Sequence, residues 1–169
     1  MKKFELTNEF ITNMFGTKLF RIRALVEFGD VEAGELGGYV EKESNLGHDD
    51  NAWVYGNARV YGDAQVSGDA RVYGNARVCG DARVCGNGDY AYAHGFGSVN
   101  RTTTFFRLKD GGVGVRCGCF YGTLAQFRDK IRETHGETKK AQEYLMLADL
   151  MELRFEEDEN EVGNRKYVE

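Results

Sequence analysis

The stretch from Asn51 to Gly86 reads NAWVYG-NARVYG-DAQVSG-DARVYG-NARVCG-DARVCG, which is one six-residue unit written six times. Every unit begins with Asn or Asp, has Ala second and Val fourth, and ends with Gly. Ala and Val stand two residues apart and therefore point to the same side of an extended chain. A six-residue period does not fit the 3.6-residue period of a helix, and Gly followed by Asn or Asp is typical of a turn. The repeat thus predicts short strands joined by corners, which is the pattern of a β-helix.

The hexads also predict which residues lie above one another. Three hexads are expected to close one triangular coil, so that residues three hexads apart lie on neighbouring strands about 4.8 Å apart. Val and Ala are expected to fill the narrow interior, where larger side chains would crowd. The residues immediately before and after each Val are then expected to point outward.

A longer run, LGGYVEKESNLGHDDNAWVYGNARVYG at residues 36–62, resembles the start of hexapeptide-repeat proteins found in phages and prophages. The order Val-x-Gly-Asn/Asp-Ala likewise resembles the left-handed β-helix family. This resemblance implies a left-handed coil, against the usual preference for right-handed crossovers, and a homo-oligomer, commonly a trimer. The expected fold class is therefore mainly β, with a short left-handed parallel β-helix of hexapeptide repeats over residues 36–98.

The segments next to the hexads are expected to cap or close the coil. Residues 1–35 are interpreted as an N-terminal capping segment that covers the first coil, because the end of a solenoid exposes unpaired backbone. Within this segment, alternating side chains predict a strand over 18–28 with one apolar face, whereas 7–15 is expected to be a short helix or irregular. Residues 87–98 are interpreted as a widened last coil or an exit loop.

Residues 99–155 predict a separate module of a β-hairpin and two helices. Strands over 102–108 and 113–120 flank a Gly-containing turn, and Thr123 with Gln126 forms a capping box at the start of the first helix. The second helix, over 137–155, has an apolar set broad enough to face both its own hairpin and a partner: Ala141, Tyr144, Leu145, Ala148, Leu150 and Met151. Residues 156–169 are expected to form an acidic tail.

Composition excludes several classes of function. The chain has 22 Lys and Arg against 27 Asp and Glu, a formal net charge of −5, so bulk nucleic-acid binding is not expected. No long apolar segment predicts a signal peptide or membrane span, which favours a cytoplasmic location. The four cysteines lack a metal-binding spacing and are expected to be reduced thiols: Cys79, Cys85, Cys117 and Cys119. No cofactor and no metal is predicted.

The side chains that flank the valines form the predicted binding surface. Stacking by three hexads places Arg59 over Arg77, and Tyr55 over Tyr73. Guanidinium and aromatic groups of this kind can hold an anionic or planar ligand, and they also suit a subunit interface. A third interpretation is a solvated surface on which the arginines pair with Asp63, Asp69 and Asp81. The predicted ligand- or partner-binding residues are Trp53, Tyr55, Arg59, Tyr61, Arg71, Tyr73, Arg77 and Arg83.

These observations favour a non-enzymatic oligomeric binding protein of phage origin. Its expected partners are a second copy of itself, as a dimer or trimer, and a host-defence protein or a small anionic ligand such as a nucleotide signal, which it would sequester in the host cytoplasm. The alternative is a CoA-dependent acyltransferase, which needs a general base in a groove between subunits. His48 and His94 are the candidate bases, whereas His135 is expected to lie at the end of a helix.

Overall fold

The hexads form three stacks of two-residue strands in the computed structural model, which describes residues 2–98 and 101–156. Parallel pairing joins residues three hexads apart, such as Arg59 with Arg77, and Gln65 with Arg83. This confirms the predicted stacking. The strands are β4 (Trp53–Val54), β5 (Arg59–Val60), β6 (Gln65–Val66), β7 (Arg71–Val72), β8 (Arg77–Val78) and β9 (Arg83–Val84).

Valine and alanine fill the interior of this solenoid, as predicted. Val60 and Val78 lie in register on β5 and β8, and both are fully buried. The corners need glycine: Gly62 and Gly80 have φ angles of 67° and 63°, a region that side chains with a Cβ rarely adopt. A Cβ at Gly62 would also lie 3.0 Å from the backbone nitrogen of Gly80 on the next coil. The fixed glycine column therefore allows the coils to approach each other closely.

The N-terminal segment adds two antiparallel strands to one face of the solenoid. β1 (Phe4–Thr12) pairs with β2 (Lys18–Ala24), β2 pairs with β3 (Leu36–Val40), and β3 pairs in parallel with β5. The prediction of a helix or irregular segment over 7–15 is wrong for residues 7–12, which belong to β1; residues 10–12 pair with β2, and the register shifts between Leu6 and Phe10. The strand predicted over 18–28 ends at Ala24, and within it Ile22 and Ala24 are buried whereas Arg23 is exposed, as the alternation predicts.

An antiparallel sheet follows the solenoid. Its strands, in spatial order, are β10 (Tyr90–His94), β11 (Thr102–Arg107), β12 (Val113–Cys117) and β13 (Phe120–Thr123). The interpretation of 87–98 as a last coil or exit loop is wrong for residues 90–94, which pair with β11. Tyr90 is too large for the interior of a coil and instead closes its end. Its hydroxyl donates to the carbonyl of Arg71 and accepts a hydrogen bond from the amide of Tyr73.

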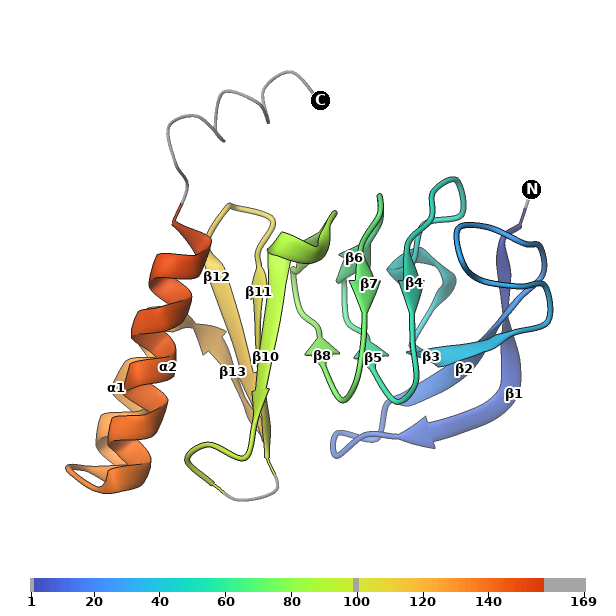
Figure 1. The fold of residues 1–169 in the computed structure, drawn as a ribbon. Coiled ribbons are helices and arrows are strands. Elements are labelled where there is room, and N and C mark those ends of the chain that lie inside the picture. The colour runs from blue at the N-terminus through green and yellow to red at the C-terminus, as the bar shows by residue number, and fades with distance from the viewer. Residues whose placement is uncertain (1, 99–100, 157–169) are drawn as a thin grey trace.

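The C-terminal sheet separates the solenoid from two helices, so that helices, sheet, solenoid and N-terminal hairpin follow one another in space (Figure 1). On one face of the sheet Phe106 joins the solenoid core, and on the other Phe105 packs against α1 (Leu124–His135) and α2 (Lys139–Phe155). The predicted capping box is confirmed, since the side chains and amides of Thr123 and Gln126 bond reciprocally. The predicted acidic tail lies outside the described residues, apart from Glu156.

Candidate functional site

On the face formed by β4 and β7, the N-terminal segment covers Trp53. The ring of Phe4 lies edge-on to the indole of Trp53 with 6.4 Å between centroids, and the ring of Phe28 lies at 5.3 Å. Trp53 is consequently fully buried. The prediction that Trp53 forms part of an exposed binding surface is therefore wrong, because residues far upstream in the sequence pack over it.

The same side of the coil carries a group of side chains that interact with one another, namely Tyr55, Arg71 and Tyr73. The two tyrosine rings stack with centroids 4.5 Å apart, which confirms their predicted stacking. Asp30 accepts a hydrogen bond from the Tyr55 hydroxyl at 3.1 Å and forms an ion pair with Arg71 at 3.1 Å. Burial, followed by the bond to Asp30, raises the pKa of Tyr55. These groups already have partners, so little of their binding capacity is left for a ligand.

Arg83 and Tyr61 are also engaged within the fold. The Arg83 guanidinium donates to the backbone carbonyls of Asp63 and Ala82 at 2.8 and 2.9 Å, and its neighbour in register is Gln65. Tyr61 is only 9% exposed, so its prediction as a surface residue is wrong. The C-terminal sheet approaches the solenoid here, and burial raises the pKa of the neighbouring Cys79 thiol to about 11.

The β5–β8 face has a different character, because Arg59 and Arg77 open into a cavity of about 430 Å³. Three further parts of the chain complete it: the tip of the N-terminal hairpin, the adjoining ends of β10 and β11, and the turn after β12. We call this site the arginine cavity. Its lining residues are Met14, Asn57, Arg59, Asn75, Arg77, His94, Arg101, Thr102 and Gly118, and none of them is a carboxylate.

Like charges face each other in the arginine cavity. Arg59 and Arg77 are partners in register on adjacent strands, and burial together with the charge of Arg77 lowers the pKa of Arg59. Among the described residues, no carboxylate forms an ion pair with Arg59, Arg77 or Arg101. Like charges directly opposite on neighbouring strands destabilise a sheet. The fold therefore keeps an unfavourable cluster of positive charge that an anion would relieve.

Arg101 reaches the cavity because of a glycine. Gly118 lies in the turn between β12 and β13 with φ of 58°, and a Cβ there would lie 2.9 Å from the guanidinium carbon of Arg101. His94 is held nearby, with its Nδ1 2.9 Å from the hydroxyl oxygen of Thr102. The sequence reasoning had His94 as a candidate base but missed Arg101. The sequence signal that could have indicated the close approach of Arg101 was the glycine of the Cys117-Gly118-Cys119 turn.

Arg116 adds a fourth guanidinium close by, and it was also missed. It is 6% exposed, its Nε has no hydrogen-bond partner among the described residues, and its guanidinium lies 5.0 Å from the ring centroid of Phe15 and 5.9 Å from that of Tyr61. It is the register partner of Thr104, whose hydroxyl accepts a hydrogen bond from the amide of Arg77. Arg116 thus increases the positive potential at this junction of solenoid and sheet.

The other two histidines lie away from the arginine cavity. His48 stacks on Phe4 with centroids 4.3 Å apart, and its Nδ1 accepts a hydrogen bond from the amide of Lys3. It therefore has a packing role. His135 lies in the last turn of α1, as predicted, and stacks on Tyr144.

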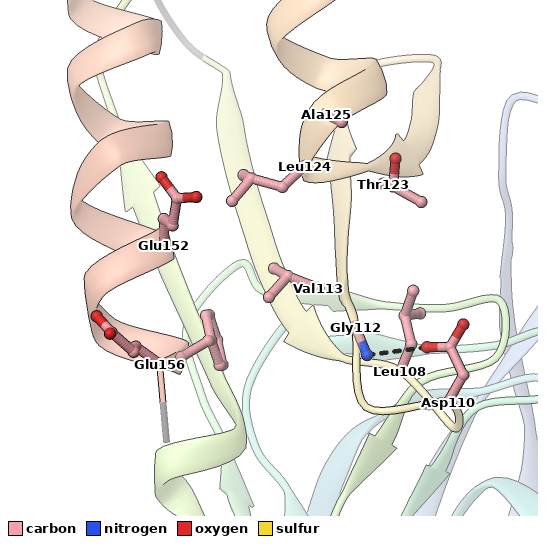
Figure 2. Close-up of a pocket in the computed structure, with 10 residues that line it drawn as sticks. Leu108, Asp110, Gly112, Val113, Thr123, Leu124, Ala125, Glu152 and Glu156 are labelled. Carbon is pink, nitrogen blue, oxygen red and sulfur yellow. Dashed lines mark hydrogen bonds between the residues drawn. The ribbon is translucent and has the colours of Figure 1, made fainter. Parts of the chain in front are cut away.

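A second cavity, of about 570 Å³, lies between the β11–β12 turn, the start of α1 and the end of α2 (Figure 2). Leu108, Val113 and Leu124 form apolar walls. Glu152 and Glu156 line its other side, and the carboxylate of Asp110 accepts a hydrogen bond from the amide of Gly112 at 2.8 Å. It is larger than the arginine cavity, but no predicted binding residue lines it. Its acidic groups show no convergence on a common point.

Fold and site together define a β-solenoid whose open end is closed by an antiparallel sheet and two helices. Residues 52–68 and 64–80 match a family model described as the YdcK beta solenoid repeat. The match falls on the hexads and supports the β-solenoid architecture. A search of curated proteins found no match to the chain. Neither described helix is long and apolar enough to cross a membrane, and the described residues contain no group of three acidic, His or Cys side chains suited to a metal.

Proposed function

We propose that this chain is a non-enzymatic binding protein that holds a phosphate-bearing ligand in the arginine cavity. One observation carries the proposal: Arg59, Arg77 and Arg101 line a common cavity without a carboxylate, in a chain whose net charge is −5. Guanidinium groups bind phosphate oxygens through paired, charge-assisted hydrogen bonds. A bound phosphate would also offset the repulsion between the two stacked arginines.

The lining favours a small polar ligand such as a nucleotide. The cavity volume of about 430 Å³ falls within the range of roughly 300–1,000 Å³ typical of small-molecule sites. Asn57, Asn75 and Thr102 offer neutral donors and acceptors for hydroxyl groups or a base edge, and Met14 is the one large apolar side chain in the lining. These groups suit a charged ligand with several polar atoms.

The resemblance to phage hexapeptide-repeat proteins extends this proposal. In that context the chain is a left-handed, oligomeric, phage-derived protein of the host cytoplasm that sequesters a nucleotide signal of host defence. Its support is the run at residues 36–62 together with the arginine cavity. A host-defence protein with an acidic surface is the macromolecular alternative for the same site.

Calorimetric titration tests the proposed ligand class. AMP, cyclic dinucleotides and inorganic phosphate are titrated into the wild-type protein, and we expect at least one nucleotide to bind. Loss of two charge-assisted contacts in the double variant Arg59→Gln, Arg77→Gln should weaken that binding by roughly 100-fold or more. Arg83→Gln is the matched control, because Arg83 occupies the same hexad position on another face. Binding that survives in the double variant contradicts the proposal.

His94 in the cavity favours an acyltransferase as the second candidate function. Acetyl-CoA carries phosphates and would bind in either case, so turnover and not binding separates the two. An acyltransferase would release free CoA in the presence of an amine or hydroxyl acceptor, and His94→Ala would abolish the release. A protein that binds nucleotides and releases no CoA supports the binding function.

A further inference from the structure

The tip of the β1–β2 hairpin presents an exposed aromatic ring beside the arginine cavity. Phe15 is 62% exposed, and its neighbour in the chain, Met14, lines that cavity. The hairpin passes below the solenoid strands in the view of Figure 1 and points toward the C-terminal sheet. Because consecutive Cα atoms are about 3.8 Å apart, Phe15 lies at the edge of the cavity.

Arg116 of the C-terminal sheet supports this ring from one side. Its guanidinium carbon lies over the Phe15 ring, 5.0 Å from the centroid, and 5.9 Å from the centroid of the Tyr61 ring. Arg116 stands two residues before Gly118, which also lines the cavity. Both members of the Phe15–Arg116 pair therefore adjoin the wall of the arginine cavity.

The hairpin tip holds Phe15 in an ordered turn. The Asn13 side chain accepts hydrogen bonds from the amides of Phe15 and Thr17, each at 3.0 Å, and Gly16 has a φ of 83°, which suits a tight turn. With a buried guanidinium over one face, the ring still has exposed surface for a second planar group. A side chain held in this way loses little conformational freedom when a ligand packs against it.

A cationic cavity with an aromatic ring at its edge is a combination suited to nucleotides. Guanidinium groups hold phosphate, and planar bases stack on aromatic side chains. The cavity has the first part in Arg59, Arg77 and Arg101, and Phe15 supplies the second. A free phosphate would need the arginines but would make no use of the exposed ring.

We infer that the cavity holds a nucleotide whose base stacks on the exposed surface of Phe15 while Arg59 and Arg77 bind its phosphate. The inference rests on the function proposed above and specifies it, because the base is bound as well as the phosphate. Stacking tolerates different bases, since every base has a planar face. Phe15 is therefore a positioning residue for the base, and the arginines supply the charge.

A comparison of AMP with ribose 5-phosphate, which has no base, tests the stacking separately from the phosphate site. In calorimetric titrations, Phe15→Ala should weaken AMP binding by about 10-fold and leave ribose 5-phosphate binding unchanged. Phe10→Ala is the matched control, because Phe10 is 46% exposed on the same hairpin. It is in register with Phe20 and Val40 and so lies on the other side of the sheet from Arg59. This variant should bind AMP as the wild type does.

Failure of the stacking and failure of the proposed function give different results. An unchanged affinity of Phe15→Ala for AMP, or an equal loss of affinity for AMP and ribose 5-phosphate, overturns the stacking while the wild type still binds phosphate. A wild-type protein that binds neither of these ligands, nor inorganic phosphate, contradicts both the stacking and the phosphate site.

Fluorescence provides a second readout that does not depend on a loss of affinity. Phe15→Trp adds an exposed indole to a chain whose single native tryptophan, Trp53, is fully buried. AMP should quench the added emission by stacking, whereas ribose 5-phosphate should not, and Phe10→Trp should respond to neither ligand. Equal quenching of both tryptophan variants by AMP would indicate random collision and contradict the stacking.

Discussion

Arg71 and Arg77 occupy the same position in two hexads, yet their surroundings are opposite. On the β4–β7 face, Asp30 of the N-terminal segment pairs with Arg71 and aromatic rings cover the neighbouring Trp53. On the β5–β8 face, Arg77 is the register partner of Arg59 and lines the same cavity as Arg101 and His94. The repeat thus determines where a side chain lies, whereas segments outside the repeat determine whether it is neutralised. Among the described residues, the β5–β8 face thus carries two stacked arginines without an ion pair, whereas Arg71 on the β4–β7 face is paired with Asp30.

The largest predicted difference between the two faces is in the free energy of unfolding when the residue before valine is changed to alanine. Trp53→Ala removes a fully buried indole and should lower the free energy of unfolding by about 3–5 kcal/mol. Arg59→Ala, at the same hexad position, should change it little, because no ion pair joins Arg59 to another described residue. Urea denaturation of both variants measures the difference. Similar losses in the two variants would show that Arg59 is also a core residue.

Cys79 and Cys85 provide a comparison at the position after valine. Burial raises the pKa of Cys79 to about 11, whereas Cys85 is exposed. The pKa of Cys79 is higher in the folded than in the unfolded protein, so the neutral thiol favours the folded state. Its contribution to the free energy of unfolding is complete below the unfolded pKa and is lost as the pH rises toward 11. Stability should fall by on the order of 1 kcal/mol from pH 8 to pH 10 through this group.

Replacing each cysteine separately checks that assignment. Denaturation curves at several pH values should show a flatter decline for Cys79→Ala than for Cys85→Ala, which should follow the wild type. A thiol reagent at pH 8 should modify Cys85 in the folded protein and leave Cys79 unreacted. Rapid modification of Cys79 would indicate that the C-terminal sheet does not cover the solenoid end.

The smallest expected effects are stability changes of opposite sign when Arg77 and Arg71 are each changed to Gln. Without ligand, Arg77→Gln should raise the free energy of unfolding by about 0.2–1 kcal/mol, because it removes a like charge opposite Arg59. Arg71→Gln should lower the melting temperature slightly, since it removes the ion pair with Asp30. Differential scanning calorimetry at low salt measures both, and added salt should diminish both shifts. Shifts in the same direction would contradict the electrostatic contrast between the faces.

The hexad period sufficed to predict the interior of the solenoid and its stacking, because six copies of one pattern leave a single register for valine. The helices were predictable from local signals such as the capping residue Thr123. The coverage of Trp53 was not, since Phe4 and Phe28 reach it through folding of the N-terminal segment. Arg101 and Arg116 were missed for a similar reason: strand pairing in the C-terminal sheet brings them to the solenoid, and β10 gave no strong strand pattern.

The number of coils sets the distance between the N-terminal hairpin and the C-terminal sheet. Met14, from the N-terminal hairpin, and His94, from the C-terminal sheet, line one cavity although solenoid strands lie between their segments. Each added coil would move the ends apart by about 4.8 Å, the distance between neighbouring strands. Lengthening the repeat by three hexads would therefore pull the walls of the cavity apart, while shortening it would make them collide. The length of the repeat is thus a dimension of the cavity itself.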